Sequence, residues 1–154
     1  MEVPSREQVV ELLKTDVTKF NEMRLETGRK PIDLSGVDLS GQDLSGADLG
    51  RCNLTGANLR GANLQGATTG GAILDKADFR DTNLVDCNFH HCNMRGVDLR
   101  GATLTPLLGG MGKMCVNAHS FEGVRYDKEH LAKMIEALNL NSDWQIKYEI
   151  VPKP

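Results

Sequence analysis

An apolar residue recurs at every fifth position through the middle of this chain, and this period constrains the fold more than any other feature. The fifteen positions run from Leu34 to Leu104, and Thr69 is the one polar exception among them. A period of five fits neither an amphipathic helix, which repeats every 3.6 residues, nor a strand, which alternates every two. Such a period predicts a repeat architecture, in which each unit buries its apolar side only by stacking on its neighbours.

Each five-residue unit combines one large apolar residue with a small residue two positions earlier. The small residue is Ala in seven units and Cys in three, and Asp or Asn stands between the two in twelve of the fifteen units. Asp and Asn favour turns because they bond to nearby backbone groups, and the Gly that usually ends the unit relieves the bend. We therefore predict an all-β repeat solenoid with an apolar interior. Its core is expected to include Leu44, Leu64, Leu84, Phe79, Phe89 and Leu99.

The units Ala57-Asn58-Leu59-Arg60-Gly61 and 62–66 show the repeat in its most regular form, which is Ala, then Asp or Asn, then Leu, any residue and Gly. This pattern resembles the pentapeptide-repeat family, and the resemblance covers residues 32 to 106. It implies a right-handed quadrilateral β-helix, with four units per coil and residues twenty apart directly above one another. On that basis the block makes just under four coils, about 18 Å tall at the spacing between paired strands.

The chain is expected to form one structural domain with four segments. Residues 1–30 are predicted to be an N-terminal cap, with a helix over 5 to 27 that begins at a capping box of Ser5 and Gln8 and stops at Gly28. Residues 31–106 are the β-helix, 107–128 a loop and a degenerate last coil, and 127–154 a C-terminal cap of helix and strand. The first helix is expected to cover the open end of the stack, the alternative being a helix that binds a partner. Its apolar face comprises Val9, Leu12, Leu13, Val17, Phe20 and Met23.

The exceptions inside the repeat have structural explanations. Thr69 is expected to bond a local carbonyl so that the coil continues, the alternative being a functional kink or loop. Cys52, Cys87 and Cys92 fall in the small inward column and are predicted to be packing residues rather than disulfide partners or metal ligands. In this register His90 and His91 point outward, so we expect solvated imidazoles, with ligand binding as the open alternative.

A column of three arginines is the best candidate for an interaction face. Arg60, Arg80 and Arg100 are twenty residues apart and follow the central residue of their units, so four-unit coils would stack them. Stacked guanidinium groups repel each other, and nearby aspartates are expected to relieve the repulsion. The predicted face therefore also includes Asp78, Asp81 and Asp98. It is either a solvated face of mixed charge or a site for a phosphate or an acidic partner.

The sequence predicts a protein that is not an enzyme, with no catalytic site, cofactor or metal. No Ser, His and Asp can be assigned the roles of a triad, and no carboxylate pair stands apart from the repeating turn residues. The first functional hypothesis is a non-catalytic interaction scaffold that presents rigid faces to an unknown protein partner. A homodimer through the C-terminal cap is left open.

The second hypothesis comes from the resemblance. Some pentapeptide-repeat proteins imitate DNA and modulate DNA gyrase, which confers drug resistance. Imitating DNA requires dense, unneutralised negative charge, whereas residues 32 to 106 contain nine Asp against six Lys or Arg. This hypothesis therefore ranks second.

Charge and hydropathy give weaker indications. The net charge of −3 offers no basis for direct binding to nucleic acid. The start Met1-Glu2-Val3-Pro4 lacks the basic and apolar segments of a signal peptide, and no apolar stretch is long enough to cross a bilayer. We expect a cytoplasmic protein without membrane contact.

Overall fold

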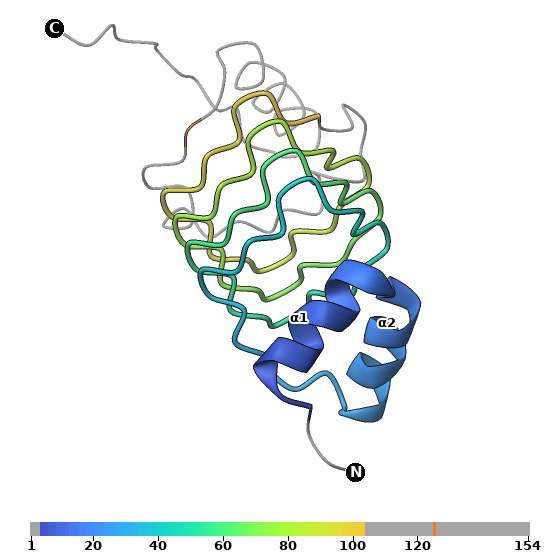
Figure 1. The fold of residues 1–154 in the computed structure, drawn as a ribbon. Coiled ribbons are helices and arrows are strands. Elements are labelled where there is room, and N and C mark those ends of the chain that lie inside the picture. The colour runs from blue at the N-terminus through green and yellow to red at the C-terminus, as the bar shows by residue number, and fades with distance from the viewer. Residues whose placement is uncertain (1–3, 104–124, 126–154) are drawn as a thin grey trace, which may run out of the picture.

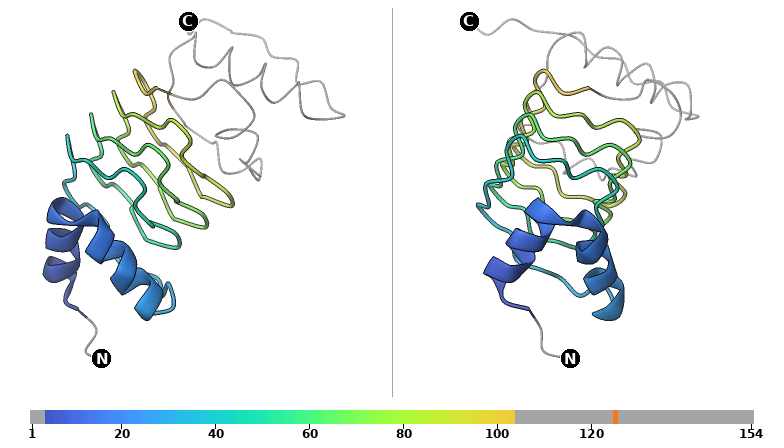
Figure 2. Two further views of the ribbon diagram at one scale, coloured as in Figure 1. Left: turned by 90° about the vertical axis from the view of Figure 1, so that its right-hand side faces the viewer. Right: turned by 45° about the vertical axis from the view of Figure 1, so that its right-hand side comes forward.

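The chain folds into a stack of coils with two helices against its N-terminal end. The structure is a computed structural model that describes residues 4–103 and residue 125. The helices α1 (Arg6–Thr15) and α2 (Val17–Glu26) precede the coils (Figure 1). Seen from the side, the coils form parallel layers (Figure 2). Apart from Arg125, the predicted loop, degenerate coil and C-terminal cap lie outside the described residues.

Residues twenty apart lie above one another throughout the stack. Twelve isolated parallel bridges join the described residues, and eleven of them link positions that differ by twenty. The bridges form four vertical series, so the coil has four faces. The first face contains Asp33, Asn53, Ile73 and Asn93, the second Asp38, Asn58, Asp78 and Asp98, the third Asp43, Asn63, Asn83 and Thr103, and the fourth Asp48, Thr68 and Asn88.

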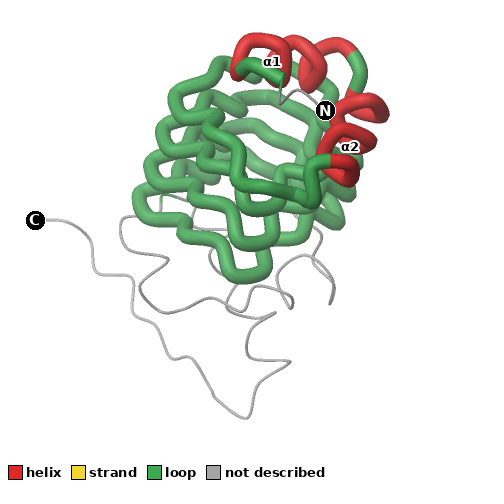
Figure 3. The backbone as a smooth tube through the Cα atoms, turned by 90° about the horizontal axis from the view of Figure 1, so that it is seen from below, coloured by secondary structure: helices red, strands yellow, loops and turns green. Residues whose placement is uncertain are grey.

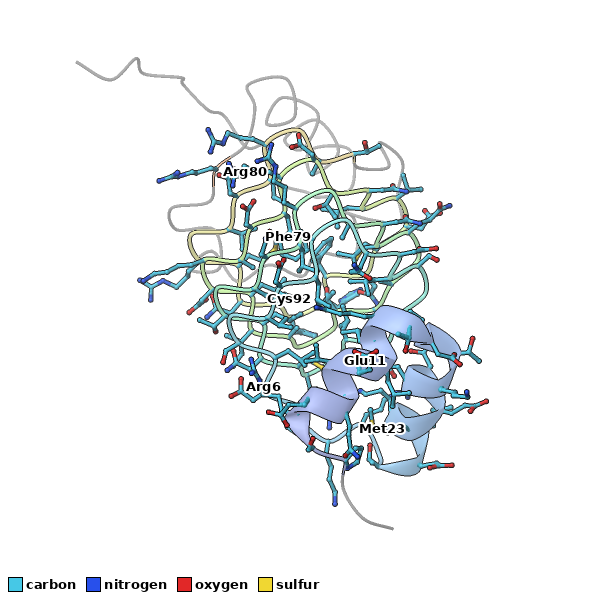
Figure 4. All side chains as sticks on the ribbon, in the orientation of Figure 1. Arg6, Glu11, Met23, Phe79, Arg80 and Cys92 are labelled. Atoms are coloured by element: carbon cyan, nitrogen blue, oxygen red, sulfur yellow. The ribbon has the colours of Figure 1, made fainter. Side chains whose placement is uncertain are left out.

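Both apolar columns point into the stack. The six expected core residues are at most 3% exposed. Phe79 and Phe89 meet edge to face, with ring centroids 6.3 Å apart. Figure 4 shows Phe79 and Cys92 inside the coils and Arg80 at the outer edge. Each buried leucine or phenylalanine stabilises the stack by about 1.5–3 kcal/mol, so the interior is the main source of stability.

The residue between the two columns holds each turn. On the third face, the Oδ1 atom of Asp43 accepts the N–H of Ser45 at 3.2 Å. It also accepts the side-chain amide of Asn63 from the next coil at 2.9 Å. Asn63 in turn accepts the side-chain amide of Asn83 at 2.9 Å. Asparagine and aspartate therefore stabilise the turn within a coil and link neighbouring coils.

Thr69 keeps the coil in register, as predicted. Its hydroxyl donates to the carbonyl of Asn88 at 2.8 Å and contacts the Sγ atom of Cys92 at 3.4 Å. Cys52, Cys87 and Cys92 are buried free thiols, which confirms their prediction as packing residues, and Cys115 lies outside the described residues. Burial raises the pKa of Cys52 to about 11 and that of Cys87 to about 12, so both stay protonated at neutral pH.

The prediction of one helix over residues 5 to 27 was wrong, because the segment breaks at Asp16. The backbone of Asp16 has φ −154° and ψ 85°, which is not helical. Its N–H donates to Leu12 at the end of α1, and its carboxylate accepts the N–H of Lys19 at the start of α2. Asp16 thus caps both helices. The capping box of Ser5 and Gln8 is present as predicted.

The break lets both helices cover the end of the stack, and Figure 3 shows them at one end of the layered coils. Val9, Leu13 and Phe20 are buried in the same core as the coils. Leu12, Val17 and Met23 pack against that core and are partly buried. The apolar face that the sequence predicted is therefore the face that meets the coils.

Side chains from the helices replace the missing coil at this end. Inside the stack, carbonyls two residues apart accept backbone N–H groups from the preceding coil, as Asp78 does from Leu59 and Arg80 from Gly61. In the first coil, the corresponding carbonyls of Asp33 and Ser35 accept Nε and Nη2 of Arg6, at 3.2 and 2.5 Å. One guanidinium thus takes the place of two backbone donors.

Arg24 does the same on the fourth face, where the side chain is fully buried. Its Nε and Nη2 donate to the carbonyls of Asp48, at 3.1 Å, and Gly50, and its Nη1 donates to Lys30. Asn21 completes this edge by donating to Gly46 at 3.0 Å and accepting the N–H of Asp48 at 2.8 Å. These bonds satisfy backbone groups that would be costly to bury unpaired.

Candidate functional site

The structure brings the six residues of the predicted interaction face together on the second face of the stack. We call this set, Arg60, Arg80, Arg100, Asp78, Asp81 and Asp98, the arginine face. The three arginines follow the central residues of successive coils, and the bridges join Asn58, Asp78 and Asp98 beneath them. Ser40 occupies the corresponding place in the first coil.

Two arginines bind the aspartate two residues before them in the chain. The Nε atom of Arg80 lies 2.8 and 3.0 Å from the two carboxylate oxygens of Asp78. Arg100 forms a fork on Asp98, with Nε at 2.9 Å and Nη2 at 2.6 Å. Arg80 also lies 3.9 Å from Asp98 in the next coil. Paired contacts of this kind fix the plane of the guanidinium.

Arg60 binds a carboxylate in the next coil, because the residue two before it is Asn58. Its Nε atom lies 3.1 Å from Oδ2 of Asp81. Asp81 takes the turn position that is usually Gly and has φ +59°. A Cβ atom at Gly101 would come within 2.3 Å of Oδ1 of Asp81. A side chain at this position would displace the carboxylate of Asp81, and Gly101 also has φ +74°, a conformation that favours glycine.

The guanidinium groups are more exposed than two of the three carboxylates beneath them. The arginine side chains are 38–55% exposed, whereas Asp78 is 26% and Asp98 14% exposed. Hydrogen bonds from Arg80 and Arg100 hold the pKa values of Asp78 and Asp98 below their usual range. The pKa of Arg80 is raised, mainly by its hydrogen bonds to Asp78. Asp78, Asp98 and Arg80 are therefore ionised at neutral pH. The exposed groups of the face are its three arginines and Asp81, which is 57% exposed.

A further cation continues the second face beyond Asp98. Arg125 forms a parallel bridge with Asp98, and its N–H donates to the carbonyl of Val97 at 2.8 Å. Its side chain is exposed. The two bridged residues are 27 positions apart instead of twenty, so seven additional residues precede this part of the coil. Arg125 therefore adds a fourth cation to this face.

The two histidines lie on the surface and form no metal site with other described residues. His90 is half-buried and His91 exposed, with ring centroids 5.8 Å apart. In the part of the chain that the structure describes, no cluster of three His, Cys, Asp or Glu residues could hold a metal ion. The expectations of no metal, no cofactor and no catalysis stay predictions.

Sequence analysis missed a second charged cluster, where α2 meets the fourth face. Arg29 binds Asp48 with Nε and Oδ2 2.6 Å apart, above the buried Arg24. Arg24 directly follows the apolar residue of its helical turn. The spacing of apolar residues along the helix therefore gives no indication of what the Arg24 side chain binds. The signal that could have found it is the open edge of the first coil, whose carbonyls require donors.

The family comparison agrees with the repeat in both sequence and structure. The family described as "Pentapeptide repeats" matches residues 32–68 and 70–105, in eight copies. The repeat region belongs to the pentapeptide repeat family. The gap between the two matches falls on Thr69, the polar centre. A comparison with curated protein sequences finds no match.

Solved structures that resemble the chain are also pentapeptide repeat proteins. Rfr23 from the cyanobacterium Cyanothece 51142 is 28% identical over 62% of this chain and 57% of its own, with a TM-score of 0.46. HetL from Nostoc sp. PCC 7120, described as involved in heterocyst differentiation regulation, is 32% identical over 60% of this chain and 38% of its own, with a TM-score of 0.47.

QnrB1, a plasmid-mediated fluoroquinolone resistance protein, is 14% identical over 70% of this chain and 64% of its own, with a TM-score of 0.26. The chain thus spans little more than half the length of Rfr23 and less than half that of HetL. With TM-scores below 0.5, these likenesses say nothing about the partners of this chain.

Among the described residues, neither helix has the length and hydropathy of a membrane span.

Proposed function

We propose that this pentapeptide repeat protein is a non-catalytic scaffold whose arginine face binds an acidic surface of a partner protein. The β-helix, which we take to be right-handed as the family resemblance implies, holds the face rigid. One observation supports the proposal above all others: guanidinium groups form the outer layer while Asp78 and Asp98 lie beneath them. A partner therefore meets fixed cations, although the six side chains sum to zero charge.

Rigidity makes such a face suitable for recognition. Each guanidinium is oriented by at least one carboxylate before a partner arrives, so little side-chain freedom is lost on binding. Its remaining N–H groups can bind carboxylates in pairs. Cationic groups spaced by one coil, about 4.8 Å apart, suit an extended acidic segment that lies along the stack.

Imitation of DNA has less support on this face. A DNA mimic needs exposed carboxylates, whereas Asp78 and Asp98 are covered by their arginines. We therefore keep modulation of DNA gyrase as an outcome of the test. The homodimer through the C-terminal cap concerns residues outside the described range and stays a prediction.

The test compares two variants that lose the same charge. In the first variant, Gln replaces Arg60, Arg80 and Arg100. In the control variant, Gln replaces Lys14, Lys19 and Lys76. The probe is an oligoglutamate peptide, titrated by calorimetry at low and physiological salt. We expect about ten-fold weaker binding for the arginine variant and less than a two-fold change for the control.

Equal losses in the two variants would contradict the proposal, because they would indicate general charge attraction. A supercoiling assay with DNA gyrase forms the second arm. Inhibition that persists in the arginine variant would favour the DNA-mimic hypothesis instead. Circular dichroism confirms that each variant is folded.

A further inference from the structure

A groove of about 700 Å³ lies where the C-terminal end of α2 meets the fourth face. Its walls include Arg29 from the segment after α2 and Arg51 from the first coil. Gly50, Thr68 and Gly70 form part of its lining on the coil side. The groove is separate from the arginine face, which occupies the second face of the stack.

Two glycines keep the coil side of this groove open. Gly50 and Gly70 stand at the position where the second face carries Arg60 and Arg80. A Cβ atom at Gly50 would lie 3.2 Å from Oδ1 of Asp48 and 3.4 Å from the carbonyl of Gly70. A side chain at Gly50 would therefore be crowded against these atoms, and at both glycines the groove is lined by backbone.

The two arginines of the groove have donors to spare. Arg29 uses Nε to bind Asp48, and its side chain is 58% exposed. Its two terminal nitrogens make no hydrogen bond within the described residues. Arg51 is exposed, and its guanidinium has no ion pair or hydrogen bond to any residue in the range 4–103. This contrasts with Arg60 and Arg80, each of which binds a carboxylate.

A buried charge beneath the groove adds to its positive potential. Arg24 is fully buried and donates to the carbonyls of Lys30, Asp48 and Gly50, which are neutral groups. The described residues that line the groove, together with Arg24, thus contain three guanidinium groups and one carboxylate, that of Asp48. A charge inside protein is screened less than one in water, so the surplus acts on the groove above it.

We propose that this groove binds a phosphate group between Arg29 and Arg51. Guanidinium groups bind phosphate oxygens through paired N–H donors. Thr68, an exposed residue of the lining, carries a hydroxyl that can also donate. The volume falls within the usual range of small-molecule sites and exceeds what a bare ion fills. The phosphate group of a small phosphate ester fits this combination of charge and space.

The test titrates the full chain with inorganic phosphate and, separately, with phenyl phosphate, and follows backbone amides by NMR. Chloride at matched ionic strength serves as the reference. We expect saturable shifts at Gly50, Arg51 and Gly70 that chloride does not produce. Tighter binding of phenyl phosphate would indicate an ester as the ligand, and equal binding would indicate free phosphate.

Two variants separate the groove from general charge effects. Arg51→Gln removes a groove cation, and Lys76→Gln removes a cation from the same turn position on the first face, with φ 58° against 59° for Arg51. We expect at least five-fold weaker phosphate binding for Arg51→Gln and less than a two-fold change for Lys76→Gln. Equal effects of the two variants, shifts that chloride reproduces, or no saturable shift at about 50 mM phosphate would overturn the proposal.

Discussion

The first coil and the inner coils of this stack solve one hydrogen-bonding problem in different ways. In an inner coil the carbonyls of Asp78 and Arg80 receive backbone N–H groups from the coil before. In the first coil the corresponding carbonyls of Asp48 and Gly50 accept hydrogen bonds from the guanidinium of Arg24. Between the described coils the repeat therefore supplies its own partners, whereas at the N-terminal edge side chains replace the missing backbone on the first and fourth faces.

This difference matters because a repeat stack ends in an unpaired edge. An open edge exposes donors and acceptors that could pair with another chain. Arginine suits the edge of a coil because its Nε and Nη2 can reach two carbonyls that stand two residues apart, as Arg6 does with Asp33 and Ser35. The helix pair thus contributes apolar cover and polar termination together.

Replacing a core leucine with aspartate should have the largest effect. Leu84 is 1% exposed, so Leu84→Asp would place an unpaired carboxylate in an apolar interior and unfold the stack. Circular dichroism should show loss of the native spectrum at 25 °C. Val85→Asp, which changes the outward-facing neighbour, is the control and should stay folded. A folded Leu84→Asp protein would contradict the inward placement of the column.

Replacing the buried terminal arginine should have the next largest effect. Arg24→Met keeps the apolar stem but leaves buried carbonyls without donors, which costs about 2–4 kcal/mol in the free energy of unfolding. Arg6→Met removes an equivalent fork from an exposed side chain, where water can replace the donors, and should cost about 1 kcal/mol or less. Urea denaturation measures both. Equal costs would show that burial of the edge is unimportant.

The buried thiols should make stability depend on pH in the alkaline range. Burial raises the pKa of Cys52 from 9.0 to about 11. Because the folded pKa exceeds the unfolded one, this contribution is complete below pH 9 and is lost as the pH rises toward 11. Cys52→Ala, which introduces the commonest residue of this column, should show a smaller decrease in Tm between pH 8 and 11. Parallel Tm curves for the two proteins would disprove this contribution.

The smallest expected effect concerns turns within the stack. Lys76 occupies the usual glycine position with φ 58°, so Lys76→Gly should relieve backbone strain and stabilise the fold by about 0.5–1 kcal/mol. The reverse change, Gly61→Lys, introduces a side chain at φ 67° where the space is open, and should destabilise by a similar amount. Thermal denaturation of both variants measures the strain. A destabilised Lys76→Gly would mean that the lysine side chain contributes more than its backbone costs.

The inner coils could be predicted from sequence because every unit repeats the same physical solution. Leu44 and Leu64 stand twenty apart in the sequence and in the same column of the structure, and even Thr69 follows the expected register. The family resemblance supplied the number of faces, which the bridges confirm. The pairing of Arg80 with Asp78 and Asp98 also follows from the register alone, since it places the three side chains on one face.

The ends and exceptions could not be predicted in the same way. The break at Asp16 depends on how two helices fit the end of the stack, and the helical pattern continues across it without interruption. Arg24 looks like a solvated helix residue until the carbonyls of the first coil are placed against it. The groove beside Arg29 and Arg51 arises from that same junction, which no repeat describes.

The most direct test of the coil register is the measurement of NMR couplings across hydrogen bonds. Such couplings identify which carbonyl accepts each backbone amide. The structure predicts that the amide of Leu59 couples to the carbonyl of Asp78, and the amide of Gly61 to that of Arg80, each 19 residues later. Couplings to carbonyls about 14 or 24 residues later would give a coil of three or five units and contradict the four-sided stack.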